Sequence, residues 1–317
     1  MPLMSDAPRP ITAADAAAVV PLPQVDANKY SRGNLVVVAG SARYPGAAVL
    51  AAQASARCGC GYTTLCVPQP AVGDVRAHLL SVPVVGCADV DGTFGAQSVD
   101  DVVSAAPKAR AYTIGCGVGR TQAAQDFVWA FLSNSAIVGK PLVIDADALF
   151  AIAQDPRRFA SLRPEGAPAV LTPHEGEAAR LLGHPVSDRL AAVRELADTY
   201  QATVVLKGPQ TVITAPSDTP RLCVNAGPEL AKAGTGDVLA GMIGAFLAQG
   251  MSSMDAACLG VYLHGRAGAS AAARLGVVSV MPEDVIDYIA PAICSLEPHD
   301  AALAAARLDA ETRATAL

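Results

Sequence analysis

Aromatic and charged residues are both scarce in this chain. Of its 317 residues, 4% are aromatic and 16% are charged, while 52% are hydrophobic, many of them alanine. A chain of this length buries an ample core, either as one large α/β domain or as two smaller ones. Because a sparsely charged surface is compatible with contacts between copies of the chain, we expect a homo-oligomer. The expected state is a homotetramer, a number of copies that the composition does not itself fix.

The chain also lacks an uninterrupted apolar run of the roughly 18 residues that a membrane span needs. Residues 1–10 are polar and rich in proline, without the basic and apolar regions of a signal peptide. No run of Lys or Arg occurs, and the net charge of −6 with an isoelectric point near 5.3 argues against nucleic acid as a partner. We therefore expect a soluble, cytoplasmic protein that binds neither membranes nor nucleic acids.

Cysteine motifs for metal or disulfide chemistry are absent as well. None of the eight cysteines forms a Cys-x-x-Cys pair, and the five histidines are scattered along the chain. Zinc needs clustered ligands, so a zinc site is not indicated. Buried, reduced thiols are the expectation for a cytosolic protein.

What the sequence does contain is an alternation of short β-branched runs with alanine-rich windows, which is typical of βαβ units and a mainly parallel sheet. Strands are expected at Leu35–Ala39, Tyr62–Val67, Ala111–Ile114, Leu142–Ile144, Ala169–Leu171 and Thr203–Leu206, with an antiparallel ribbon at Gln210–Ile213 and Arg221–Val224. Helices are expected at Gly46–Arg57, Thr121–Asn134, Glu175–Leu182, Asp188–Tyr200, Val238–Gln249, Ser253–Arg274 and Pro282–Ile293. We predict one α/β domain over residues 29–295, its central sheet flanked by helices on both faces. We expect residues 1–28 to form a loose N-terminal segment and residues 296–317 to form a C-terminal tail.

The most informative motif is a glycine loop that opens directly onto an apolar helix, Gly234-Thr235-Gly236-Asp237. Both glycines tolerate positive φ, so that backbone N–H groups and the start of the helix can converge on a phosphate group. Resting phosphate would repel an ionised Asp237, which is therefore suited to accept a proton from an attacking hydroxyl. The alternative is that Asp237 only caps the helix; the double-glycine approach favours catalysis.

Further motifs follow other predicted strands, at the edge where open α/β sheets bind ligands. Small residues at positions 39–41 and 46–48 leave room for a bulky ligand or form an ordinary turn. The run Gly115–Gly119 superficially resembles a dinucleotide fingerprint, although its third glycine comes one residue early. Asp145 and Asp147 either organise magnesium and phosphate or have a structural role, in which Asp147 caps a helix and Asp145 holds loop amides; we favour structure or support.

Two more segments offer polar groups at this edge. His174 stands at the entry of a helix with Glu177 completing a capping box, and its position favours substrate contact over a purely structural role. The turn Lys207-Gly208-Pro209-Gln210-Thr211 presents a cation and a hydroxyl that suit a nucleotide. Its alternative interpretation is a plain β-turn with a solvated lysine.

Taken together, these motifs resemble the ADP/ATP-dependent NAD(P)H-hydrate dehydratases, relatives of ribokinase, over roughly residues 29–292. The resemblance depends on the order of many motifs, and implies a ribokinase-like single domain. The matching segments are Lys29 with Gly33, Ala39-Gly40-Ser41, Gly46-Ala47-Ala48, Asp145-Ala146-Asp147-Ala148-Leu149, Thr172-Pro173-His174, Gly176-Glu177, Lys207-Gly208 with Thr211, Gly234-Thr235-Gly236-Asp237, and His264-Gly265.

The resemblance implies that the S-form of hydrated NADH or NADPH is returned to NADH or NADPH at the expense of ADP, preferred here over ATP, with Mg²⁺ whose ligands stay unassigned. Asp237 would take the proton of the ring hydroxyl as its oxygen attacks the terminal phosphoryl group, and the ring nitrogen would then expel phosphate, leaving AMP as the other product. Gly234, Thr235 and Gly236 would supply amides that stabilise charge. The implied contacts to the hydrated dinucleotide are Ala47, Gly117, His174 and Asp237, and those to the adenine nucleotide are Lys207, Gly208, Pro209, Gln210, Thr211 and Gly236.

The chain departs from the family pattern in places. Cys116 stands where the family usually has proline, which would loosen that turn. Members often carry a fused epimerase domain, for which this chain has no room, so a separate NAD(P)H-hydrate epimerase is the expected pathway partner. The runner-up function is a ribokinase-like kinase of a vitamin-precursor or sugar alcohol. A Rossmann oxidoreductase and a non-catalytic nucleotide sensor are further alternatives.

Overall fold

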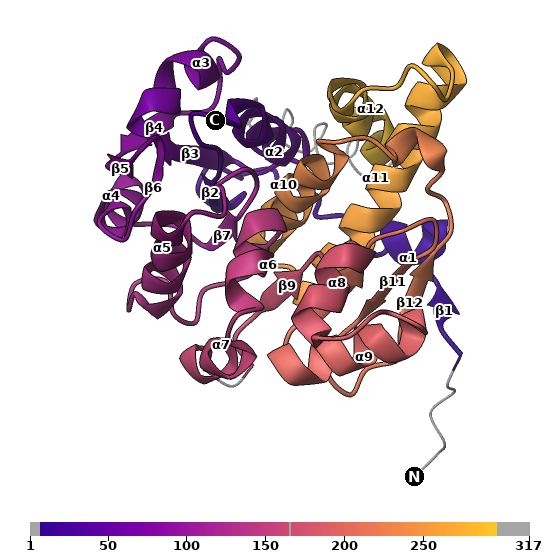
Figure 1. Ribbon diagram of the computed structural model, residues 1–317. Helices are drawn as coiled ribbons and strands as arrows, with labels where there is room; N and C mark the ends of the chain where they lie inside the picture. The colour runs from indigo at the N-terminus through magenta and orange to yellow at the C-terminus, as the bar shows by residue number, and fades with distance from the viewer. Residues whose placement is uncertain (1–6, 165, 297–317) are drawn as a thin grey trace, which may run out of the picture.

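The computed structural model describes residues 7–164 and 166–296. Its centre is a ten-stranded sheet in which only β11 runs antiparallel to its neighbours among the described strands (Figure 1). In spatial order the strands are β1 (Arg9–Pro10), β12 (Arg221–Cys223), β11 (Thr211–Thr214), β10 (Thr203–Leu206), β9 (Ala169–Leu171), β8 (Leu142–Ile144), β7 (Ala111–Ile114), β2 (Asn34–Val38), β3 (Tyr62–Pro68) and β4 (Val84–Cys87). A separate two-stranded ribbon pairs β5 (Asp89–Val90) with β6 (Thr93–Phe94).

Helices cover both faces of the sheet, as predicted. Those on one face are α1 (Ala13–Ala17), α2 (Pro45–Arg57), α3 (Val72–Arg76), α10 (Thr235–Ala248), α11 (Ser253–Leu275) and α12 (Pro282–Cys294). Those on the other are α4 (Ser98–Ala105), α5 (Gln122–Ser133), α6 (Ala146–Ile152), α7 (Pro156–Leu162), α8 (Glu175–Leu182) and α9 (Arg189–Tyr200). Within the described residues, none of these helices combines the length and apolar character that crossing a membrane requires.

The two faces have separate hydrophobic cores because side chains alternate along each strand. In β2, Leu35 and Val37 join the core under α2 and α10, whereas Val36 and Val38 join the core under α4 to α9. A strand buried on both faces has few polar positions, which explains the apolar run that follows the buried Asn34 in β2. Short continuous apolar runs, and not an alternating pattern, therefore identify these strands in the sequence.

Helix α10 lies against the sheet and between α2 and α11 (Figure 1). Two glycines permit this close approach: a Cβ at Gly241 would lie 2.1 Å from the carbonyl oxygen of Ala51, and one at Gly244 would lie 2.0 Å from Thr113 Oγ1. The packing directs the first turn of α10 toward the carboxyl ends of the central parallel strands. That turn carries the predicted glycine loop.

Most predicted elements are confirmed, with ends that shift by a residue or so. The antiparallel ribbon is β11 and β12, and α10 begins at Thr235 rather than at Val238. The expectation of a loose N-terminal segment is wrong for residues 9–17, since β1 pairs with β12 and the Thr12 side chain caps α1. The predicted tail falls, apart from residue 296, outside the described residues.

Candidate active site

Four loops meet at the carboxyl edge of the sheet, after β7, β8, β9 and β10, and the start of α10 lies beside them. Backbone contacts hold the loops together. His174 and Lys207 form an isolated parallel bridge between the loops after β9 and β10, and the Lys207 N–H donates to the Pro173 carbonyl at 2.8 Å. The Gly40 N–H donates to the Cys116 carbonyl at 2.7 Å, which joins the loop after β2 to the loop after β7.

Asp237 is the third residue of α10, one turn into the helix and not at its cap. Gly234 occupies the N-cap position with φ of +97°, which rules out Asp237 as the capping residue. Gly236 is helical and does not have the positive φ that the motif predicts. A Cβ on Gly236 would lie 3.3 Å from Lys207 Nζ, so glycine here lets the lysine approach the turn.

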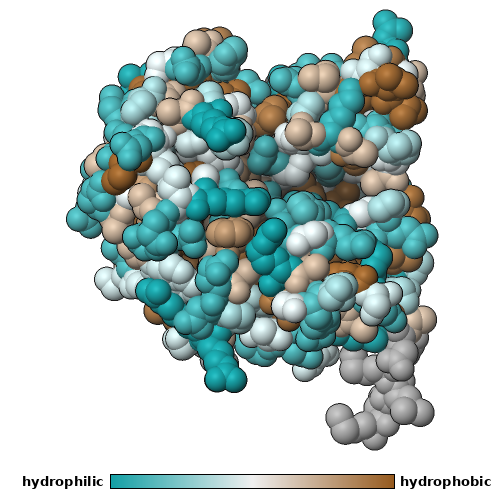
Figure 2. Space-filling model, in the orientation of Figure 1, coloured by the Kyte–Doolittle hydropathy of each residue, from teal (hydrophilic) through white to brown (hydrophobic). Residues whose placement is uncertain are grey.

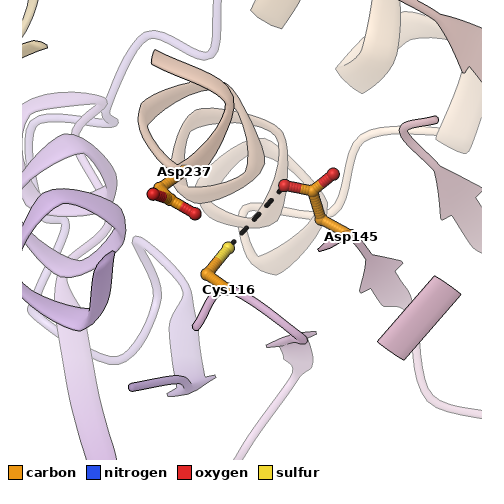
Figure 3. A group of neighbouring side chains, drawn as sticks. All are labelled: Cys116, Asp145 and Asp237. Atoms are coloured by element: carbon orange, nitrogen blue, oxygen red, sulfur yellow. Dashed lines mark hydrogen bonds between the residues drawn. The ribbon is translucent and has the colours of Figure 1, made fainter. Parts of the chain in front are cut away.

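Asp237 faces two other polar side chains, Cys116 and Asp145 (Figure 3). One ligand atom from each of the three lies within 4.8 Å of the others. Burial, and then the negative charge of Asp145, raise the pKa of Asp237 to about 7, although the Cys116 thiol and Lys207 act in the opposite direction. A carboxylate with such a pKa is suited to general-base chemistry near neutral pH.

Asp145 is buried and forms the centre of a polar network. Its Oδ1 accepts hydrogen bonds from Thr172 Oγ1 at 2.7 Å and from Lys207 Nζ at 2.9 Å, and its Oδ2 lies 3.8 Å from the Cys116 sulfur. Lys207 is therefore not the solvated lysine of a plain β-turn. Burial by itself would lower the pKa of Lys207, but the charges of Asp145 and Glu177 outweigh it and raise that pKa, so the ammonium stays protonated.

The roles expected for Asp145 and Asp147 are exchanged. Asp145 stands at the N-cap of α6, yet its carboxylate makes no capping bond among the described residues and serves the network instead. Asp147 holds the loop: it accepts the Gly119 N–H at 2.9 Å and Arg120 Nε at 2.7 Å. The sequence shows two carboxylates after a strand but cannot show which of them turns inward.

The group of Cys116, Asp145 and Asp237 does not fit Mg²⁺ well. Magnesium prefers an octahedron of oxygen ligands, whereas this group contains a sulfur. In addition, Lys207 already neutralises Asp145. These three side chains are therefore not suited to hold Mg²⁺ by themselves.

His174 has the capping role that the sequence predicted. It caps α8, its Nδ1 accepting the N–H groups of Gly176 at 3.0 Å and Glu177 at 3.3 Å, while Glu177 accepts the His174 N–H at 2.8 Å. The predicted capping box is thus confirmed. Since Nδ1 accepts, a neutral ring carries its proton on Nε2, and the side chain is 59% exposed. This donor lies 3.5 Å from Glu177 Oε1.

Ala47 and Gly117, predicted to contact the same ligand, are direct neighbours. Gly117 has φ of +67°, and a Cβ on it would lie 2.8 Å from the Ala47 Cβ. The space beside Gly117 is filled by Ala47 and Tyr44, so glycine here permits close contact between the start of α2 and the loop after β7. For both residues, contact with a ligand stays a prediction.

A pocket of about 410 Å³ lies next to the cluster of Cys116, Asp145 and Asp237, and Gly236 forms part of its wall. Its wall includes Lys207, Gly208, Pro209, Thr211 and Gly236, all predicted to bind nucleotide, whereas the exposed Gln210 is not part of it. In Figure 2, apolar residues line a hollow to the right of centre, in the region where Figure 1 draws α10 and α11. The lining residues that the sequence did not suggest are Ala226, Gly227, Pro228, Leu230, Ala231, Leu239 and Val261.

His264 also lines this pocket, from α11. Burial lowers its pKa to about 4, so the imidazole is neutral, and its Nε2 has no hydrogen-bond partner among the described residues. The sequence indicated His264 only as part of the His264-Gly265 segment that matches the family pattern. Its place in the pocket wall depends on α11 packing beside α10, which local sequence does not reveal.

Comparison with known proteins gives consistent matches. Residues 35–291 match a family model described as NAD(P)H-hydrate dehydratase. An ADP-dependent (S)-NAD(P)H-hydrate dehydratase of Neisseria meningitidis is 37% identical over 246 residues, 76% of this chain and 78% of that protein. The bifunctional NAD(P)H-hydrate repair enzyme Nnr of Moorella thermoacetica is 34% identical over 95% of this chain but 56% of its own length, so the chain spans little more than half of that relative.

Solved structures agree with the sequence matches. The ADP/ATP-dependent NAD(P)H-hydrate dehydratase of Bacillus subtilis, co-crystallised with ATP and Mg²⁺, superposes with a TM-score of 0.77 at 27% identity. The match covers 93% of this chain and all of that one. Hydroxyethylthiazole kinase of Pyrococcus horikoshii, with a TM-score of 0.59 at 16% identity, shares the fold alone.

Proposed function

Because the chain belongs to the NAD(P)H-hydrate dehydratase family of ribokinase-like proteins, we propose that it dehydrates the S-form of hydrated NADH or NADPH. The co-substrate is ADP, and the products are NADH or NADPH, AMP and phosphate. The observation that carries the proposal is the position of Asp237. Its partly buried carboxylate, with a pKa of about 7, lies one turn into α10 and next to a glycine that borders the pocket.

The pocket suits the adenine nucleotide. Its volume of about 410 Å³ lies in the range of small-molecule sites, and its wall is mostly apolar, as an adenine base requires. Lys207 and the N-terminal turn of α10 bring positive charge and backbone N–H groups to the end of the pocket where phosphates would lie. Mg²⁺ would accompany the phosphates, which supply the oxygen ligands that it prefers.

The hydrated dinucleotide would lie on the other side of Asp237, near Ala47, Gly117 and His174. Asp237 accepts the proton of the ring hydroxyl while that oxygen attacks the terminal phosphoryl group of ADP, and AMP departs. The amides of Gly234, Thr235 and Gly236, with Lys207, stabilise the charge that develops on the phosphoryl oxygens.

The second half of the reaction uses a better leaving group. Phosphate leaves the ring carbon as the nitrogen lone pair forms the C=N bond, and loss of a proton from the adjacent carbon restores the ring double bond. The sum is removal of one water from the hydrate and transfer of its oxygen to phosphate. An enzyme specific for the S-form leaves the other epimer untouched, and we therefore propose an epimerase acting in the same pathway. The homo-oligomer and the cytoplasmic location stay predictions.

The test supplies the purified chain with hydrated NADPH or NADH, Mg²⁺ and either ADP or ATP. We expect absorbance at the wavelength of the reduced nicotinamide to recover, with one AMP and one phosphate formed for each reduced dinucleotide when ADP is used. Accumulation of a stable phosphorylated organic product, without recovery of NADPH or NADH, would support the small-molecule kinase instead. Comparing the rates with ADP and with ATP identifies the co-substrate.

A further inference from the structure

Glu177 is a buried carboxylate that the reaction steps above do not use. It is the third residue of α8, and its side chain is 6% exposed. Burial raises its pKa, although the positive charge of Lys207 acts in the opposite direction. A buried carboxylate is costly unless it has partners, and Glu177 has partners on two sides.

Those contacts join the two sides of the site. On one side, Glu177 Oε2 accepts the His174 N–H at 2.8 Å, and Oε1 lies 3.5 Å from His174 Nε2. On the other side, Oε2 lies 3.9 Å from Lys207 Nζ. One carboxylate therefore contacts the histidine assigned to the dinucleotide and the lysine assigned to the nucleotide.

Lys207 is held between two carboxylates, Asp145 at 2.9 Å and Glu177 at 3.9 Å. The loops that carry His174 and Lys207 are already paired through their backbones. A ligand whose phosphate orders Lys207 therefore also affects Glu177, and through it the ring of His174. In the reverse direction, a ligand that fixes the His174 ring limits the freedom of Glu177 and Lys207. Such mutual ordering gives positive coupling between two ligands.

We propose that Glu177 is a positioning residue that couples the dinucleotide subsite to the nucleotide subsite by holding His174 and Lys207 in one arrangement. This inference rests on the proposed function, which assigns the two subsites. Glu177 contacts neither substrate in this role. Its effect reaches both through the side chains that it orients.

The variant Glu177→Gln separates coupling from folding. A glutamine at the third helical position still accepts the N-cap N–H in a capping box, so α8 should begin as before. The negative charge toward Lys207 and His174 is lost. Glu195→Gln is the matched control, because Glu195 is a 52% exposed carboxylate on α9 that pairs with the exposed His184, away from both subsites.

The experiment measures by calorimetry the Kd of NADPH with and without saturating ADP, a pair that cannot turn over. In the wild type and in Glu195→Gln we expect ADP to tighten NADPH binding by about fivefold or more. In Glu177→Gln the factor should fall to near one, while ADP alone still binds and the melting temperature is retained. A role in folding alone would lower the melting temperature and leave the coupling factor unchanged.

Two results would overturn the inference alone: independent binding of ADP and NADPH to the wild type, or wild-type coupling in Glu177→Gln. A wild-type chain that binds neither ligand would overturn the proposed function as well, and the turnover assay shows separately whether that function holds. KM values give a second measurement. Glu177→Gln should raise KM for both the hydrate and ADP, whereas a residue confined to one subsite would raise only one.

Discussion

Asp237 is the side chain to which we assign the proton transfer. Asp237→Asn keeps the size of the residue and the backbone amides of Gly234–Gly236 but removes the proton acceptor. We expect turnover to fall by about 10²–10⁴-fold, the usual contribution of general-base catalysis. The Kd of ADP should change little, because the phosphate-binding amides remain. Near-normal turnover in this variant would show that another group accepts the proton.

The same substitution has a consequence for stability. The folded pKa of Asp237 is about 7 against an ordinary value of 3.8, so the folded state binds the proton more tightly than the unfolded state does. Stability is therefore lost as the pH rises from about 4 to about 7, and Asp237→Asn removes this loss. The quantity to compare is the unfolding free energy of the variant minus that of the wild type. We expect this difference to be about 1–3 kcal/mol larger at pH 8 than at pH 5, since one pKa unit corresponds to about 1.4 kcal/mol. Denaturant titrations of both proteins at the two pH values measure this difference, and equal differences would contradict the raised pKa.

Substitutions at His174 can separate its capping of α8 from the dinucleotide contact that we propose for it. His174→Ala removes both the cap of α8 and the exposed Nε2 donor. It should lower the unfolding free energy by about 0.5–2 kcal/mol and raise the KM for the hydrate severalfold. His174→Asn supplies a strong N-cap residue and should recover the stability. An unchanged KM in His174→Ala would remove this residue from the dinucleotide subsite.

At the scale of elements, the sequence predicted strand bounds best where a single short apolar run forms the whole strand. Ala111–Ile114 and Thr203–Leu206 are buried on both faces, and their ends match the prediction. The two-residue strand β1 forms only because β12 lies beside it, more than 200 residues along the chain. Helix α6 follows β8 with only Asp145 between them, and the sequence indicated it only through a possible cap at Asp147, without bounds.

The close contact of α10 with α2 depends on Gly241. A Cβ at this position would lie 2.1 Å from a backbone oxygen of Ala51, which cannot move without shifting α2. We expect Gly241→Ala to destabilise the protein by about 1–3 kcal/mol, although alanine has the higher helix propensity. Gly73→Ala is the control, because Gly73 lies in α3 and the added Cβ would have no neighbouring atom within 4 Å. The unfolding free energy of this variant should equal that of the wild type or exceed it by up to about 1 kcal/mol. Thermal or denaturant unfolding that ranks the two variants the other way would contradict this packing.

At the scale of the molecule, the site is assembled from segments that sequence order keeps apart. The glycine loop, Asp145, His174 and Lys207 were each identified from short motifs that follow predicted strands, because a parallel sheet gathers such positions at one edge. The pairing of Lys207 with Asp145, 62 residues apart, was not predictable from either motif. Nor was the wall that η2 (Pro228–Leu230) and α11 contribute to the pocket. Local chemistry is thus visible in the sequence, while the partner of each group depends on tertiary packing.

If that wall and the turn of α10 together form the nucleotide site, ADP should stabilise the whole fold. The pocket joins segments from β10 to α11, so a bound ligand links parts that must separate on unfolding. At a concentration of 100 times its Kd, ADP should add about 2.7 kcal/mol to the unfolding free energy. For 317 residues this corresponds to a rise of roughly 4 °C in the melting temperature. Inorganic phosphate at the same concentration should produce little shift, because it leaves the apolar wall empty; an equal shift with phosphate would mean that the pocket does not hold the base.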